Sequence, residues 1–123
     1  MIKGLATVIY PAPDLEQAKA WYAKAFKQQP YFDEPYYVGF NIGGYELGLD
    51  PNQTLSEPGA AGGVAYWRVA DMTQALDHFL ASGARQIAPP QDVGGGITVA
   101  TIADPFGSVI GLIENPHFTL ATT

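Results

Sequence analysis

Cysteine is absent from this sequence of 123 residues, and histidine occurs only twice. Without cysteine the chain has neither a disulfide framework nor thiolate chemistry, so cysteine usage does not indicate a redox compartment. No apolar run is long enough to cross a bilayer. Residues 1–4 lead into a strand-like run without the basic, apolar and small-residue regions of a secretory signal. We therefore expect a cytoplasmic protein with no membrane partner.

Basic residues are also few. Six Lys and Arg stand against twelve Asp and Glu, which gives a formal net charge of −6. Such a field repels phosphate backbones, and the basic residues form no patch, so we expect no nucleic-acid partner. An acidic balance favours cationic ligands, although solubility alone is the commoner reason for it.

Two glycines interrupt strand-like apolar runs. Gly48 sits between Leu47 and Leu49, and Gly111 interrupts the run that ends at Glu114. A glycine inside a strand weakens it, and it often marks a bulge or a place where another group approaches the backbone closely. Two strands with the same unusual feature indicate two copies of one unit.

The first copy is predicted to contain a strand, a helix and three more strands. A β-rich run at residues 5–10 stops at a proline corner, and Asp14 then caps a helix with Gln17 in the capping-box place. The apolar residues that follow recur at helical spacing and predict a buried face: Leu15, Ala18, Trp21, Tyr22, Ala25 and Phe26. We expect the remaining strands at residues 31–32, 36–42 and 45–49, the last two joined by a Gly-Gly turn.

The second copy repeats this order. Asp71 and Gln74 have the spacing of the first cap and its partner, and Gly83 ends the second helix. A Pro-Pro pair at residues 89–90 is expected to break the chain after a short strand. The strands of this copy are predicted at residues 64–69, 85–87, 97–102 and 109–114.

A segment rich in proline and glycine separates the two copies, as is typical of a connector. We expect one domain with module 1 at about residues 4–50, a linker at about 51–62, module 2 at about 63–115 and a C-terminal tail at 116–123. A chain of this length is large enough to bury a core as one domain.

The turn Asp104-Pro105-Phe106-Gly107 comes directly before the final strand, Val-Ile-Gly-Leu-Ile-Glu. Together with paired βαβββ units and an Asp-led helix in each, this motif resembles the vicinal oxygen chelate superfamily of glyoxalase I, bleomycin-resistance proteins and extradiol dioxygenases. The resemblance implies an α+β fold in which two tandem βαβββ modules form an eight-stranded, incompletely closed barrel. It also implies helices on the convex side, a ligand cleft on the concave side, and a homodimer.

Metal-dependent members of that superfamily hold a divalent ion with His, Glu or Gln on the first and last strands of each unit. Carried over by the turn and helix-cap positions, these places fall at Thr7, Gly48, Val64 and Gly111, and none carries a usable ligand. Neither His78 nor His117 has a second histidine at ligand spacing. We therefore expect no metal and no other cofactor. Either the two glycines leave space for a bulky ligand, or the metal-ligand positions have simply been lost.

Alternation along the strands predicts which side chains line the cleft. The candidate ligand-binding residues are Thr7, Ile9, Glu46, Gly48, Val64, Tyr66, Arg68, Val109 and Gly111. Arg68 suits a carboxylate or enolate oxygen, and Glu46 suits an amine. Glu46 is also a weak catalytic candidate, as a general base if burial raises its pKa. A structural ion pair, or exposure to solvent at the rim of the cleft, explains the charges of Glu46 and Arg68 equally well.

Tyrosines are dense in the first copy, at Tyr31, Tyr36, Tyr37 and Tyr45, which suits stacking on a flat ligand or a dimer partner. The favoured function is a metal-independent binding protein that sequesters a small molecule. The alternative is a metal-dependent or Glu-assisted lyase, isomerase or dioxygenase acting on a small oxygenated substrate. A third hypothesis is a domain that serves mainly in dimerisation.

Overall fold

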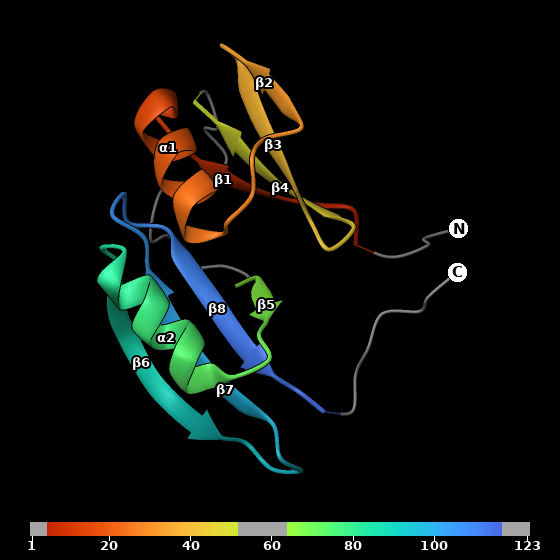
Figure 1. Cartoon of the computed structure of the whole chain (residues 1–123), viewed down its shortest axis with the longest axis vertical. Coiled ribbons are helices and arrows are strands. Elements are labelled where there is room, and N and C mark those ends of the chain that lie inside the picture. The colour runs from red at the N-terminus through yellow and green to blue at the C-terminus, as the bar shows by residue number, and fades with distance from the viewer. Residues whose placement is uncertain (1–4, 52–63, 117–123) are drawn as a thin grey trace. The chain divides into compact units, whose positions relative to one another are not determined.

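The computed structural model describes residues 5–51 and 64–116. The chain divides into two compact units, residues 1–61 and 62–123. Within its described residues each unit contains one helix and four strands in the order βαβββ, so the predicted α+β class and twin modules are confirmed (Figure 1). The expected linker and tail lie almost entirely outside the described residues, so that part of the domain division stays a prediction.

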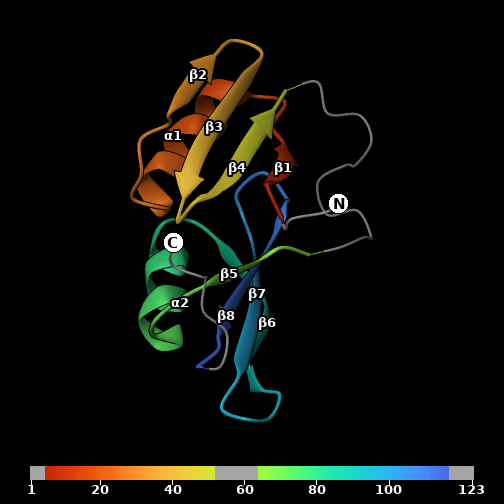
Figure 2. The same cartoon turned by 90° about the vertical axis from the view of Figure 1, so that its right-hand side faces the viewer.

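The first unit is a four-stranded sheet with a helix on one face, and Figure 2 views it from the helix-free side with α1 behind the sheet. The strand order is β1-β4-β3-β2, in which β1 and β4 are parallel and the other neighbours are antiparallel. Its elements are β1 (Thr7–Pro11), α1 (Leu15–Ala25), β2 (Phe32–Glu34), β3 (Tyr37–Ile42) and β4 (Tyr45–Asp50).

Helix α1 begins where the capping box predicts it. The backbone N–H of Gln17 donates to Oδ1 of Asp14 at 3.1 Å, which satisfies one of the free amides of the first turn. The helix buries Leu15, Ala18, Tyr22 and Ala25, whereas Trp21 and Phe26, expected on the same face, are only half-buried. Alternate residues of β3 and β4 have no exposed surface and complete the core: Val38, Phe40, Leu47 and Leu49. Each such side chain contributes about 1.5–3 kcal/mol by leaving water.

The second unit repeats this topology, with strand order β5-β8-β7-β6 and a parallel β5–β8 pair. Neither of the helices in the described parts of the chain is long and apolar enough to cross a membrane. The elements of this unit are β5 (Tyr66–Arg68), α2 (Met72–Ala81), β6 (Arg85–Asp92), β7 (Thr98–Ala103) and β8 (Val109–Glu114).

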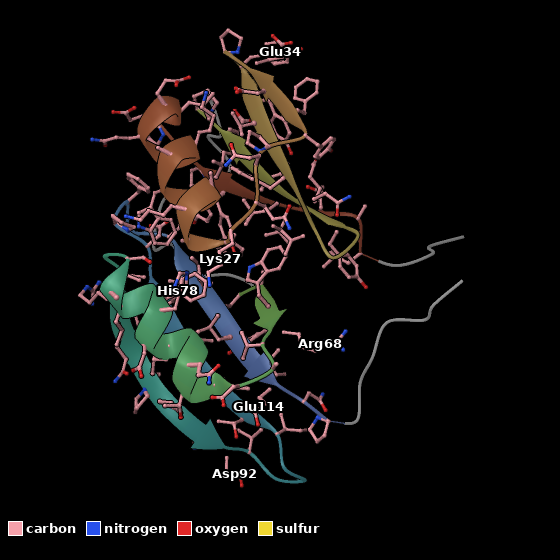
Figure 3. All side chains as sticks on the ribbon, in the orientation of Figure 1. Lys27, Glu34, Arg68, His78, Asp92 and Glu114 are labelled. Atoms are coloured by element: carbon pink, nitrogen blue, oxygen red, sulfur yellow. The ribbon has the colours of Figure 1, made fainter. Side chains whose placement is uncertain are left out.

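Two carboxylates hold the start of α2. Oδ1 of Asp71 accepts from the N–H of Gln74 at 3.0 Å, as the capping box predicts. Oε2 of Glu114, at the end of β8, accepts from the N–H of Met72 at 2.8 Å (Figure 3). Negative charge is favourable at a helix N-terminus, so the end of the last strand is tied to the first turn of the helix.

Strand β6 differs from the sequence prediction. It continues through the Pro89-Pro90 pair that was expected to break it, with register shifts between Gln86 and Ala88 and between Ala88 and Gln91. Proline is tolerated there because β6 lies at the edge of the sheet and its outward side needs no N–H donor. The predicted break was therefore wrong, and the prolines sit in an irregular edge strand.

The turn before β8 is built around one buried carboxylate. Asp104 is 5% exposed, and its Oδ1 accepts from the N–H of Phe106 at 2.9 Å and of Ser108 at 2.8 Å. Its own N–H donates to the carbonyl of Ser108 at 2.9 Å. Gly107 has a φ of 94°, a conformation that favours glycine. This turn fixes where β8 begins and so which residues of β8 face away from the helix.

Candidate functional site

The helix-free face of the first sheet brings four of the predicted residues together. Thr7 lies opposite Glu46, and Ile9 lies opposite Gly48, on the parallel β1–β4 pair. Paired residues point to the same side of a sheet, and the alternate residues of β4 are buried on the other side. The shared face predicted from alternation is therefore present, whereas a role in binding stays a prediction.

Glu46 is the centre of a hydrogen-bond cluster on this face. Its Oε1 accepts from the Thr7 hydroxyl at 2.7 Å and from the Tyr37 hydroxyl at 2.6 Å. Its Oε2 accepts from the Tyr31 hydroxyl. We call these four residues the Glu46 cluster. The sequence indicated Tyr31 and Tyr37 only as members of a tyrosine-rich region and did not assign them to Glu46.

The cluster sets the ionisation of its members. Partial burial acts to raise the pKa of Glu46, but the bonds from Tyr31, Tyr37 and Thr7 outweigh it, and the pKa is lowered from its ordinary value of 4.5. Burial and the bond to Glu46 raise the pKa of Tyr37 to about 12. Near neutral pH the cluster therefore consists of a carboxylate anion and neutral hydroxyl donors. The raised pKa that a general base would need is not found.

Gly48 makes room for the cluster. A Cβ atom at this position would lie 2.6 Å from Cζ of Tyr37 and even closer to its hydroxyl oxygen. Gly39, which pairs with Gly48 across β3 and β4, is similar, because a Cβ there would meet Oε2 of Glu46 at 2.9 Å. The space over Gly48 is thus filled by a tyrosine of the same unit.

The helix-free face of the second sheet carries the other predicted residues. Tyr66 lies opposite Gly111, Arg68 lies opposite Ile113, and Val109 shares their side by alternation. Val64 is exposed and precedes β5 instead of starting it. Figure 3 shows Arg68 projecting from β5 away from α2. Within the described part of this unit Arg68 makes no hydrogen bond or ion pair, so a structural salt bridge does not account for it there.

Tyr66 lies against the backbone of Gly111. A Cβ atom on Gly111 would be 2.5 Å from Cδ1, 2.7 Å from Cγ and 2.8 Å from Cε1 of the ring. The residue is nevertheless 46% exposed, so much of the ring remains open to a ligand. Both glycines that the sequence marked as unusual therefore lie under a tyrosine.

The places implied for a divalent ion do not fit one. Two of the four, Gly48 and Gly111, have no side chain, and tyrosines fill the space that one would need. Thr7 already donates to Glu46, and Val64 has no donor atom. Among residues 5–51 and 64–116, no group of three or more His, Asp or Glu side chains could hold a metal ion. His117 lies outside the described residues.

Solved structures with the same fold come from several members of one superfamily. A glyoxalase-related enzyme from Fulvimarina pelagi is 19% identical, with a TM-score of 0.76 over 98% of this chain and 94% of that one. A bleomycin resistance determinant encoded on the transposon Tn5 is 21% identical, with a TM-score of 0.71 over 93% and 99%. A fosfomycin resistance protein from Listeria monocytogenes is 17% identical, with a TM-score of 0.76 over 95% and 97%. At these identities the likeness shows the fold alone.

The sequence itself matches a family model across most of its length. A comparison with curated proteins gives no match. The match to the family model covers residues 4–112, which include the turn at Asp104 and both βαβββ units except the last two residues of β8. The chain therefore belongs to the Glyoxalase/Bleomycin resistance protein/Dioxygenase superfamily.

Proposed function

We propose that this chain is a metal-independent binding protein of the superfamily that sequesters a small molecule on the helix-free faces of its sheets. The observation that carries the proposal is the Glu46 cluster, an ionised carboxylate held in place by three hydroxyl groups on a partly open face. Structural neighbours named for resistance to bleomycin and to fosfomycin support a small molecule as the ligand.

The Glu46 cluster suits binding better than proton abstraction. A carboxylate has about four acceptor sites, and three are occupied by Thr7, Tyr31 and Tyr37. The remaining site can accept one charge-assisted hydrogen bond from a ligand amine. A base needs a pKa near the working pH, and the pKa of Glu46 is lowered instead. A Glu-assisted lyase or isomerase is therefore the less favoured function.

Aromatic side chains within and beside the Glu46 cluster supply contact area. Tyr31 is 63% exposed, and Phe32 stands edge-on to Tyr36 and Tyr37, with ring centroids 6.1 Å apart in each pair. Exposed rings of this kind suit a flat ligand or a second subunit. We accordingly also propose the homodimer that the family resemblance implies, and a location in the cytoplasm.

Replacing Glu46 with Gln should raise the Kd of the ligand about tenfold, because one charge-assisted hydrogen bond is lost. The ligand is first identified by a thermal-shift screen of planar antibiotics, cationic amines and 2-oxo acids, and calorimetry then measures its Kd. Glu34→Gln is the matched control. Glu34 is exposed on β2 of the same sheet (Figure 3), and its side chain makes no hydrogen bond or ion pair with the described residues. Equal weakening by both substitutions would contradict the proposal.

A further inference from the structure

In both units a tyrosine lies over the glycine of the last strand, although the two tyrosines come from different neighbouring strands. In the first, Tyr37 of β3 lies over Gly48 of β4, and in the second, Tyr66 of β5 lies over Gly111 of β8. Neither glycine has a positive φ, so backbone conformation does not require glycine at either place. The ring above each glycine is what leaves no room for a side chain.

The contact in the second unit is the more restrictive. The atoms that a Cβ at Gly111 would meet include Cγ of Tyr66, at 2.7 Å. Cγ is bonded directly to the tyrosine's own Cβ, so a small bend at the tip of the ring does not relieve the overlap. Any side chain at residue 111 has to turn the whole ring of Tyr66 away from the sheet, and an ion held by such a side chain would need the same space.

The exposed side of this ring lies on the same face of the sheet as the Arg68 guanidinium. Arg68 follows Tyr66 by two residues, so both project from the helix-free side of β5, about 7 Å apart along the strand. Arg68 makes no hydrogen bond or ion pair with the described residues of its unit. A ring already fixed against the backbone loses little freedom when a flat ligand stacks on it, and a guanidinium pairs readily with a carboxylate.

We propose that Tyr66, seated on Gly111, has converted a metal-ligand place of the superfamily into a stacking platform for a planar acid whose carboxylate pairs with Arg68. The proposal rests on the metal-independent binding function and names the class of ligand for the second sheet. It treats Gly111 as a positioning residue, because the glycine acts only by allowing the ring to lie on the strand.

The seating of the ring is tested by combining Gly111→Ala with Tyr66→Ala. Alanine is normally the better residue in a strand, so Gly111→Ala should raise the Tm when Tyr66 is absent. With Tyr66 present the same change should lower the Tm, giving a difference of about 3 °C or more between the two backgrounds. The same change in Tm in both backgrounds would contradict the claim that the Tyr66 ring lies against Gly111.

The exclusion of metal is tested with Ni²⁺ alone. V64H/G111E places a histidine and a glutamate at the two family positions while keeping Tyr66, and V64H/Y66A/G111E removes the ring. Calorimetry should show Ni²⁺ binding at least about tenfold tighter in the triple variant, because both carry the same ligands and differ only in the ring. Equal affinity, or one Ni²⁺ bound per wild-type chain, would contradict the exclusion. The alanine pair above remains a test if these variants fail to fold.

The platform itself is tested with 2-naphthoate, a planar acid. The wild type and Tyr66→Phe should bind it within about twofold of each other, whereas Tyr66→Ala and Arg68→Gln should each weaken it about tenfold. Arg85→Gln on β6 is the charge control and should leave the affinity unchanged. Absence of saturable binding, or equal affinity in Tyr66→Ala, would overturn the platform. Because these arms use neither Glu46 nor the screened ligand, they fail independently of the proposed function.

Discussion

Replacing Asp104 with alanine should lower the free energy of unfolding by about 2–4 kcal/mol, measured by urea denaturation. The carboxylate is buried and accepts from two backbone amides, those of Phe106 and Ser108. Alanine removes the acceptor of both amides, in a turn whose Asp104 and Ser108 are buried. The turn determines the start of β8, so the loss should reach the face that carries Gly111 and Ile113.

Two neighbouring substitutions separate the hydrogen bonds from other effects at this turn. Asp104→Asn keeps an oxygen acceptor, so it should lower the free energy of unfolding by less than the alanine variant does, about 1–2 kcal/mol. Ser108→Ala should be neutral or stabilising, because the buried Ser108 hydroxyl has no hydrogen-bond partner among the described residues. A similar loss from Asp104→Ala and Ser108→Ala would show that packing, and not the carboxylate, stabilises the turn.

Replacing Glu46 with alanine should cost about 2 kcal/mol of unfolding free energy at pH 7, because three hydroxyl donors lose a charged acceptor on a half-buried face. The cost should depend on pH. The pKa of Glu46 is lowered in the folded chain, so its contribution is full above the ordinary value of 4.5 and is lost as the pH falls through the folded pKa.

Urea denaturation between pH 7 and pH 3 checks this dependence. The difference between the wild type and Glu46→Ala should be constant down to about pH 5 and should shrink below it. The contribution of Tyr37 to the free energy of unfolding has the opposite pH dependence, because it is lost at alkaline pH. Its pKa is raised to about 12, so its contribution should be present below about pH 10 and lost as the pH rises through 12. A difference that grows on acidification would contradict the charge assigned to Glu46.

The sequence predicted the repeat and its helix starts because their signals are local. Asp14 with Gln17 and Asp71 with Gln74 each sit within one helical turn, and both caps are present in the structure. Gly48 and Gly111 were also recognised as unusual from their immediate neighbours. The order of elements follows from such short-range patterns, which is why the α+β class and both βαβββ units could be predicted.

The partners of those glycines were not predicted, because they come from other strands. Tyr37 reaches Gly48 across the β3–β4 pair and Tyr66 faces Gly111 across β5 and β8, so each contact depends on strand register. The sequence does not distinguish a glycine that leaves space for a bulky ligand from a glycine whose space is occupied by a tyrosine of the same unit. The path of β6 was missed for a similar reason, because prolines break a central strand but not an edge strand.

The most direct test of a metal-free binding site is calorimetric titration of the screened ligand into chelator-treated protein, with and without added Ni²⁺ or Mn²⁺. We expect the same Kd and stoichiometry in all three conditions, because the proposed site consists of the Glu46 carboxylate and the side chains of Tyr31 and Tyr37, which are held together without an ion. Binding that disappears with the chelator and returns with one equivalent of metal per chain would contradict it.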